Sequence, residues 1–251
     1  MHAIRMRNIS KTYGSRFGAV AVPALRGVSM DVARGEFVAV MGPSGAGKTT
    51  LLHAAALIDP PDSGSVFIDG QDSLGLKGDA LADFRRRKIG FVFQDSSLLE
   101  TLTLRENIEL PLALGRVPRS ESESRSSAIA ASLGIGDISG KYPSEVSIGQ
   151  RQRAAAARAV IIEPVVLLAD EPTGALDSRS GRSLLDLFAA LNAERGTAVL
   201  MATHDPFAAS WARRVLFLRD GGIFTEIRAG NDRREFFDRI MEVQAAMAGS
   251  L

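Results

Sequence analysis

The stretch Gly42-Pro43-Ser44-Gly45-Ala46-Gly47-Lys48-Thr49 decides the fold, because it matches the phosphate-binding pattern G-x-x-x-x-G-K-[ST]. Its glycines let successive backbone N–H groups turn around a phosphate with no Cβ in the way. The Lys48 ammonium can reach the β- and γ-phosphates, and the Thr49 hydroxyl can ligate Mg²⁺. Residues 36–41 have the pattern of a buried strand leading in, and residues 50–57 that of a helix leading out. The helix points its positive end at the same anion, so the sequence predicts a nucleotide-binding α/β fold.

The composition is that of an ordinary globular protein. The 251 residues are 45% hydrophobic and 24% charged, which suits one large domain or two small ones. The net charge of +1 gives no electrostatic reason to expect nucleic acid as a partner. Cysteine is absent, which excludes disulfides and thiolate metal sites. No run approaches the ~18 apolar residues that span a bilayer. We therefore expect a cytoplasmic protein that touches a membrane only through a partner.

Polar side chains follow three further apolar runs that read as buried strands. Ligands lie beyond the carboxyl ends of parallel strands, so these side chains can reach the bound phosphates. An acid at such a strand end can hold Mg²⁺, a second acid can orient water, and an amide can reach both. The candidates are Gln94 after residues 89–93, Asp170 and Glu171 after residues 165–169, and His204 after residues 197–203.

The rest of the chain changes character along its length. Residues 1–40 alternate short β-type runs with turns, and residues 98–159 have a mainly helical pattern. Within the latter, the polar residues 115–127 are expected to form an exposed loop leading into a helix. An amphipathic helix is expected over residues 183–195. The tail places Phe236, Ile240, Val243 and Met247 at helical spacing, as a stripe that packs on its own domain or on a partner.

Tyr13 lies in the β-type region near the N-terminus and is one of only two tyrosines. Two interpretations stay open. It is an aromatic side chain on a surface strand, or its ring stacks on adenine, since aromatic faces stack on bases.

One further motif gives the chain a family resemblance. The stretch Val146-Ser147-Ile148-Gly149-Gln150-Arg151-Gln152-Arg153 resembles L-S-G-G-Q-x-Q-R, the signature of the ATPase subunits of ATP-binding-cassette transporters. The resemblance covers nearly the whole chain, and its other motifs fall in family order. These are Tyr13 for the adenine-stacking loop, Gln94 for the glutamine loop, Asp170 and Glu171 for the second phosphate-site motif, Ala175-Leu176-Asp177 for the dimer-contact loop and His204 for the switch histidine.

The resemblance implies a P-loop NTPase core with a parallel sheet, an N-terminal antiparallel β subdomain and an inserted α-helical subdomain. On this basis we expect the core and the antiparallel sheet in residues 1–97 and 160–230. The helical signature subdomain is expected in residues 98–159, and an amphipathic C-terminal helix in residues 231–251.

The resemblance also implies cofactors and partners. Two subunits of the family sandwich two ATP molecules, each between one subunit's phosphate loop and the other's signature. We therefore expect a homodimer in the ATP-bound state, with Mg²⁺ at Thr49, Gln94 and Asp170. Glu171, His204 and Gln94 would carry the hydrolysis. The region after Gln94, in the helical insertion, would receive the coupling helix of a multi-span permease, which would hold the chain at the inner face of the cell membrane. The expected ATP contacts are Tyr13, Gly42, Pro43, Ser44, Gly45, Ala46, Gly47, Lys48, Thr49, Thr50, Ser147, Gly149, Gln150 and Asp177.

Three shorter stretches, residues 104–112, 170–177 and 203–206, resemble the macrolide-export and lipoprotein-release group. The end from Arg233 onward looks most like the bacitracin-export type, which handles antimicrobial peptides and is thought to transmit force. Two alternatives stay open. One is a soluble cassette ATPase in DNA repair or translation, which usually carries two cassettes or a long coiled coil. The other is a regulatory module that closes on ATP but barely turns over.

Ile148 departs from the signature, because it replaces the first glycine. Its branched side chain lies where the family brings the backbone near the γ-phosphate of the opposite site. β-branching also restricts the backbone and disfavours φ > 0. Since Ser147 and Gly149 remain, we expect reduced rather than absent ATPase activity.

Overall fold

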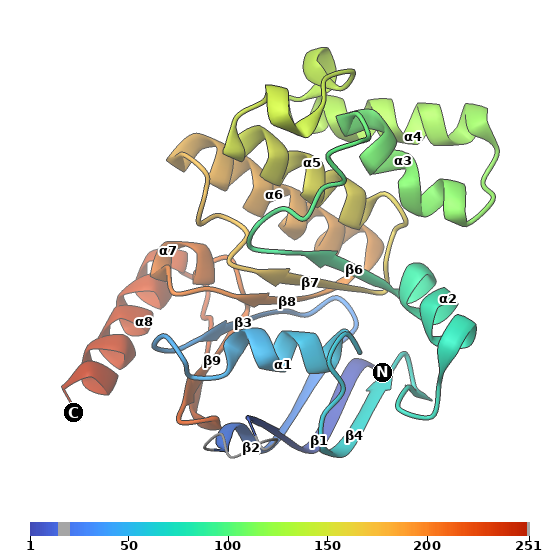
Figure 1. Ribbon diagram of the computed structural model, residues 1–251. Helices are drawn as coiled ribbons and strands as arrows, with labels where there is room; N and C mark the ends of the chain where they lie inside the picture. Colours follow the sequence, from blue (N-terminus) through green and yellow to red (C-terminus); the bar gives the residue numbers. More distant parts are fainter. Residues whose placement is uncertain (15–20, 250–251) are drawn as a thin grey trace.

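A computed structural model describes residues 1–14 and 21–249, which form two β-sheets with helix α1 (Lys48–Ala55) between them (Figure 1). The expected ranges 1–97 and 231–251 also include residues 15–20 and 250–251, which lie outside the described residues. Helices α3 (Leu104–Leu114), α4 (Arg119–Ser132), α5 (Ile148–Val160) and α6 (Ser178–Arg195) lie beyond the larger sheet, on the side opposite α1 (Figure 1). No helix among the described residues has the length and hydrophobicity needed to cross a membrane.

The larger sheet has the strand order β10-β9-β3-β8-β7-β6. Strands β9, β3, β8, β7 and β6 pair in parallel, and β10 pairs antiparallel with β9, so the predicted parallel sheet is confirmed. The strands are β3 (Phe37–Met41), β6 (Ile89–Val92), β7 (Val166–Asp170), β8 (Ala198–Ala202), β9 (Arg214–Arg219) and β10 (Gly222–Arg228).

The larger sheet is buried on both faces, which explains its continuous apolar runs. In β3, the side chains of Phe37, Ala39 and Met41 belong to one core, together with residues of α3, α5 and α6. Val38 and Val40 belong to the other core, with residues of α1 and the second sheet. Alternate residues of one strand therefore hold two layers of the protein together.

The second sheet is antiparallel, with the order β2-β1-β4-β5, and confirms the expected antiparallel subdomain. Strands β1 and β2 are longer than the short alternating runs suggested. Register shifts interrupt the pairing of β1 with β2, so the hydrophobic alternation breaks although the strands continue. The strands are β1 (His2–Tyr13), β2 (Val22–Ala33), β4 (Ser63–Ile68) and β5 (Gln71–Asp72).

The helical subdomain contains three α-helices and two short 3₁₀ turns. These are α3 (Leu104–Leu114), α4 (Arg119–Ser132), α5 (Ile148–Val160), η1 (Gly136–Ile138) and η2 (Pro143–Glu145). The remaining helices are α2 (Gly78–Lys88), α6 (Ser178–Arg195), α7 (Pro206–Ala209) and α8 (Arg233–Ala248).

The prediction of an exposed loop over residues 115–127 is wrong, because α4 already begins at Arg119. Two ion pairs at helical i,i+4 spacing stabilise this polar stretch. Arg119 pairs with Glu123, and Arg125 pairs with Glu121. The serine and glutamate residues of this stretch therefore form a solvated helix and not a loop.

The C-terminal helix α8 packs on its own domain, which settles one alternative left open by the sequence. Phe236 and Ile240 are almost fully buried, in the same core as the α3 and α6 residues. At the start of α8 the Arg233 guanidinium lies 3.2 Å from the centroid of the Trp211 ring. Helix α6 begins five residues before the predicted start, because the Asp177 carboxylate caps it by accepting from the N–H groups of Arg179 and Ser180.

Candidate functional site

The phosphate loop connects β3 to α1 and has a backbone that only glycine can supply at two positions. Gly42 and Gly47 have φ of 152° and 101°. A Cβ on Gly42 would lie 2.2 Å from the carbonyl oxygen of Leu218, and one on Gly47 would lie 2.4 Å from that of Ala24. The Lys48 ammonium donates to the carbonyls of Gly42 at 2.8 Å and Pro43 at 3.1 Å, so it lies across the loop that the sequence predicted.

Asp170 and Thr49 come together beside this loop. The Asp170 side chain ends β7 and is 4% exposed. The Thr49 hydroxyl donates a hydrogen bond to this carboxylate, while Asp170 Oδ1 has no partner among the described residues. Burial raises the pKa of Asp170, Glu171 raises it further, and the hydrogen bond from Thr49 opposes both.

This donor set fits Mg²⁺. The ion favours one or two protein oxygens together with phosphate oxygens and water over a cage made only of protein. No group of three or more His, Cys, Asp or Glu side chains in the described ranges could hold a metal by itself. A hydroxyl and one unpartnered buried carboxylate oxygen are therefore suited to an ion that arrives with a nucleotide.

Glu171 and His204 extend from neighbouring strand ends and pair with each other. His204 Nδ1 lies 2.9 Å from Glu171 Oε2, and the backbone N–H of His204 donates to the same oxygen at 3.3 Å. The Glu171 backbone has φ of 45°, a conformation that is uncommon for a side chain this large. Both residues lie just beyond the carboxyl ends of β7 and β8, as the sequence predicted, so both can reach the same bound group there.

Tyr13 ends β1 and is tied to residues near the phosphate loop. Its hydroxyl donates to Asp59 Oδ2 at 2.7 Å, and the Lys11 ammonium donates to Asp59 Oδ1 at 2.5 Å. Burial and the Asp59 carboxylate raise the pKa of Tyr13, while a hydrogen bond with Thr50 lowers it. The Tyr13 hydroxyl therefore lies next to Thr50, and Tyr13 as a whole is 42% exposed. Asp59 belongs to no motif, so sequence reasoning could not identify it.

The signature stretch begins α5 and is capped reciprocally. The Ser147 hydroxyl accepts from the N–H of Gln150 at 3.3 Å, and the Gln150 side chain accepts from the N–H of Ser147 at 2.8 Å. Gly149 packs on the dimer-contact stretch, since a Cβ there would lie 3.3 Å from the Leu176 side chain. Among the described residues, the phosphate loop has no hydrogen bond with Ser147, Gly149, Gln150 or Asp177, and α5 lies on the other side of the larger sheet from α1 (Figure 1).

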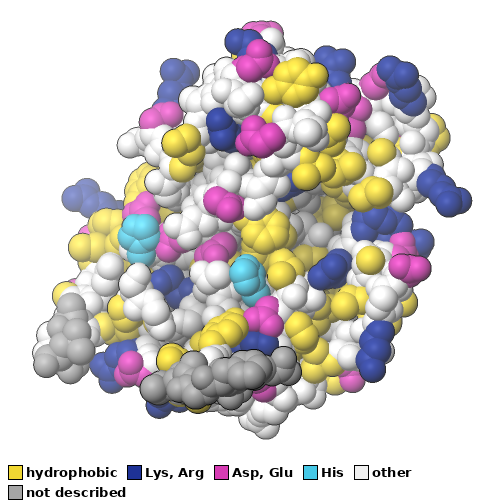
Figure 2. Space-filling model, viewed as in Figure 1, with side chains coloured by type: hydrophobic (Ala, Val, Ile, Leu, Met, Phe, Trp, Pro, Cys, Tyr) yellow, Lys and Arg dark blue, Asp and Glu magenta, His cyan; other side chains and the backbone are white. Residues whose placement is uncertain are grey.

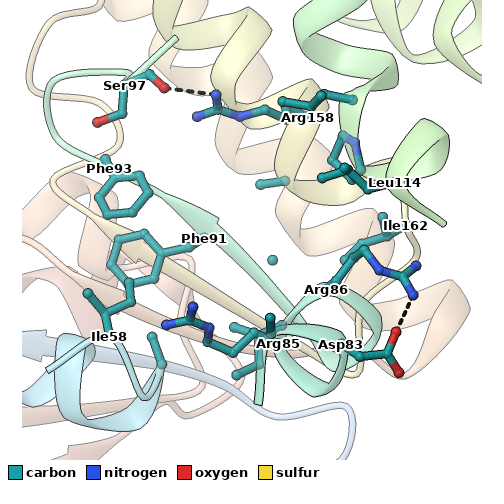
Figure 3. A pocket seen from close by; sticks show the side chains of 17 residues that line it. Ile58, Asp83, Arg85, Arg86, Phe91, Phe93, Ser97, Leu114, Arg158 and Ile162 are labelled. Carbon is teal, nitrogen blue, oxygen red and sulfur yellow. Dashed lines mark hydrogen bonds and ion pairs between the residues drawn. The ribbon is translucent and has the colours of Figure 1, made fainter. Parts of the chain in front are cut away.

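An open, largely apolar groove of about 710 Å³ lies between α2, β6, α3 and the end of α5. Figure 2 shows hydrophobic side chains gathered in the hollow on this side of the molecule. Figure 3 shows the Phe91 and Phe93 rings facing each other within the groove, with centroids 4.2 Å apart. Arg86 pairs with Asp83 at its rim. Gln94 follows Phe93 directly and is exposed.

The phosphate loop follows β3 of the parallel sheet, and Asp170 lies beside its Thr49. Glu171 and His204 pair at the adjoining strand ends. This arrangement defines a nucleotide-hydrolysing P-loop protein. Comparison with known proteins specifies the family. The model of the ABC transporter family matches residues 25–174, more than half of the chain.

Individual relatives agree over the full length. The ABC transporter ATP-binding protein YxdL of Bacillus subtilis (strain 168) is 48% identical, over 98% of this chain and 95% of that protein. The bacitracin export ATP-binding protein BceA of Halalkalibacterium halodurans is 45% identical, over 99% of this chain and 98% of its own length. The solved dimeric structure of the ATP-binding cassette MJ0796 of Methanocaldococcus jannaschii, in a post-hydrolysis state bound to ADP and Pi, has a TM-score of 0.85 and 37% identity; it covers 91% of this chain and 100% of that chain.

The chain therefore belongs to the ABC transporter family, as an ATP-binding subunit that hydrolyses ATP. It resembles the bacitracin-export and macrolide-export ATPases, as the sequence motifs predicted.

Proposed function

We propose that this subunit powers a multi-span membrane permease that gives resistance to antimicrobial peptides, by exporting them or by transmitting force. The observation that carries the proposal is the open apolar groove beside Gln94, an exposed hollow large enough for a short helix of a partner. The peptide class is supported by the bacitracin-export relative, which matches over nearly its whole length. The chain would be held peripherally at the inner face of the cell membrane through the permease.

The proposed roles follow from the geometry. Residues 42–50 bind the phosphates of ATP, with Lys48 on the β- and γ-phosphates. Thr49 and Asp170 hold Mg²⁺, and Gln94 reaches it from the end of β6. The Glu171 carboxylate polarises the attacking water, while His204, oriented by Glu171, contacts the γ-phosphate. Tyr13 stacks on adenine.

The proposed active unit is a homodimer that closes on ATP. Among the described residues of one chain the capped start of α5 makes no hydrogen bond with the phosphate loop, and the N–H groups of Ile148 and Gly149, which the cap does not use, are available to the nucleotide of a second copy. Ser147, Gly149, Gln150 and Asp177 then complete the opposite site. The dimeric MJ0796 structures support this arrangement. We also retain the proposed division into a core in residues 1–97 and 160–230, a helical subdomain in residues 98–159 and a tail in residues 231–251.

The test uses the permease encoded in the neighbouring reading frame, if that frame encodes a multi-span protein with a large extracellular domain. The two proteins are co-expressed and purified, and ATP hydrolysis is measured with and without the permease. Leu114, 66% exposed, lines the groove, so Leu114→Glu should abolish association and leave basal hydrolysis unchanged. Tyr142, 45% exposed outside the groove, gives the matched control Tyr142→Glu, which should retain association. Retention of the permease by Leu114→Glu would contradict the proposed docking surface.

The regulatory alternative is favoured by Ile148, and basal turnover distinguishes the two. A wild-type chain that binds ATP but does not hydrolyse it, alone or with the permease, would support the regulatory module. The soluble cassette ATPase has no comparable support, since a net charge of +1 provides no electrostatic footprint for nucleic acid.

A further inference from the structure

The segment 93–97, which follows β6 and carries Gln94, is fastened to α5 at two points. Near the start of α5, the Gln152 side-chain amide donates to the carbonyl of Phe93 at 2.9 Å. Near its end, the Arg158 guanidinium donates to the carbonyls of Ser97 at 2.8 Å and Ser96 at 3.1 Å. Gln152 and Arg158 are six positions apart, which is about 9 Å along the helix. One helix therefore holds both ends of the segment that presents Gln94.

The two anchoring side chains are held in place by burial. Gln152 is 2% exposed, so water cannot replace the Phe93 carbonyl as the hydrogen-bond acceptor for its side-chain amide. Arg158 is partly buried, and desolvation lowers its pKa. No carboxylate pairs with Arg158 among the described residues, so its charge is compensated only by backbone carbonyls. A cation in that position is costly unless its hydrogen bonds are retained.

The backbone that Arg158 holds is strained. Ser96 and Ser97 have φ of 62° and 45°, which places two consecutive residues with side chains in the left-handed region. Such conformations persist where surrounding contacts hold them. Among the described residues the Arg158 guanidinium makes no other side-chain hydrogen bond, and it donates to the carbonyls of these same two residues. Its removal should let the segment relax to a different path.

The fastened segment also borders the groove. Phe93, Ser97 and Arg158 all line it. Figure 3 shows the hydrogen bond between Ser97 and Arg158 at one end of the groove, on the same side as the Phe93 ring. Gln94 itself makes no side-chain hydrogen bond with any described residue, so its position depends on the backbone on either side of it.

We propose that Gln152 and Arg158 are positioning residues for ATP hydrolysis, which hold segment 93–97 on α5 and thereby set where the Gln94 side chain lies. The proposal rests on the role of Gln94 proposed above. Among the described residues neither side chain has a hydrogen bond with the phosphate loop, and both act through Gln94. The signature helix and the Gln94 segment of one chain are thus a single mechanical unit.

Variants at three positions of α5 test the anchoring directly. Arg158→Met and Gln152→Met remove the donors and keep an unbranched apolar chain of similar length. Arg153→Met is the matched control, since Arg153 lies on the same helix but donates to the carbonyl of Leu133, at 3.3 Å. Amide hydrogen exchange of residues 93–98, measured without nucleotide, should become about tenfold faster or more in the first two variants and stay unchanged in the control. Exchange in β3 and β7 reports whether the fold is intact.

Kinetics test the link to Gln94. Arg158→Met should lower kcat about tenfold with ATP affinity changed less than about twofold, because a small misplacement of a catalytic group slows chemistry without weakening binding. Arg158→Lys, which can reach one carbonyl, should recover part of the rate. In a Gln94→Ala background, Arg158→Met should cause no further loss, since both changes disable one group.

Either of two results would overturn the proposal: unchanged exchange in residues 93–98, or an equal loss of kcat in the two backgrounds. If Arg158→Met fails to fold, Gln152→Met carries the same tests. An unchanged rate in the Gln94→Ala variant would instead refute the proposed role of Gln94. Failure of the anchoring proposal and failure of the Gln94 role are therefore distinguishable.

Discussion

His204 Nδ1 lies 2.9 Å from Glu171 Oε2, so two side chains singled out separately at strand ends act as a pair. A carboxylate only accepts hydrogen bonds, so Nδ1 carries the proton and Nε2 is the ring nitrogen available to another group. The backbone N–H of His204 donates to the same oxygen and fixes the carboxylate. Glu171, with its side chain 12% exposed, therefore orients a histidine whose side chain is 72% exposed.

Glu171→Gln should bind ATP and hydrolyse it at least about 100-fold more slowly, because the amide keeps the shape and loses the carboxylate that polarises water. The amide oxygen can still accept both hydrogen bonds from His204, so the switch should stay in place. With ATP and Mg²⁺ the variant should elute as a dimer on a sizing column, since the trapped nucleotide joins two copies. Elution as a monomer under those conditions would count against the sandwich arrangement.

Lys48→Ala should weaken ATP binding by at least about 100-fold, because it removes charge-assisted hydrogen bonds worth about 1.5–3 kcal/mol each. Isothermal titration of wild type and variant measures the change. Lys77→Ala, at an exposed position before α2, is the control for a lost positive charge. Equal affinity in Lys48→Ala and wild type would refute the phosphate-loop assignment.

Asp170→Asn should stabilise the protein measured without nucleotide while abolishing Mg²⁺-dependent hydrolysis. Burial raises the pKa of Asp170 above its ordinary value of 3.8, so the charged form opposes folding. That penalty is fully present above the raised pKa and absent below 3.8. Removing it at neutral pH should add roughly 1 kcal/mol, or about 2–4 °C in Tm.

The stabilisation should shrink as the pH is lowered toward 4, which thermal melts across pH can follow. Asp238→Asn, an exposed change on α8, is the control and should show no such gain. A lower Tm for Asp170→Asn at neutral pH would contradict the prediction, because it would show that the charged Asp170 carboxylate stabilises the fold.

Tyr13→Ala should weaken ATP binding about fivefold to 100-fold, because stacking of an aromatic ring on a base is worth about 1–3 kcal/mol. Tyr13→Phe loses the hydrogen bond to Asp59 but keeps the ring, so its affinity should stay within about threefold of wild type. Fluorescence titration with a labelled ATP compares the three proteins. Unchanged affinity in Tyr13→Ala would favour the other interpretation, a surface aromatic without a role in binding.

The sequence predicted the parts of the site whose chemistry is local. The phosphate loop needs its glycines and Lys48 in one contiguous stretch, and an apolar run ending in Asp170 marks a strand end wherever it occurs. The anchors of segment 93–97 were not predictable in this way. Gln152 lies 59 positions from Phe93, and it binds a backbone carbonyl, which every residue has. Such contacts leave no residue-type pattern, so only the folded chain identifies them.

Ile148 is the first residue of α5, follows the capping Ser147 and has no positive φ. The helix start therefore does not use the conformational freedom of glycine in this structure, which argues against the conformational part of the expectation. The steric part remains, since the side chain is 68% exposed at the helix end that is proposed to face the partner's nucleotide.

If the side chain obstructs closure, both Ile148→Gly and Ile148→Ala should raise steady-state hydrolysis by about twofold to tenfold, which corresponds to about 0.4–1.4 kcal/mol. Gly also costs roughly 0.5–1 kcal/mol of stability in a helix, so Ala should give the larger gain per unit of folded protein. Met241→Ala, which trims an exposed apolar side chain on α8, is the control and should leave the rate unchanged. A rise in the Gly variant alone would restore the conformational explanation. Unchanged or lower rates in both variants would mean that the dimer accommodates Ile148, and that the departure from the signature is not a brake on turnover.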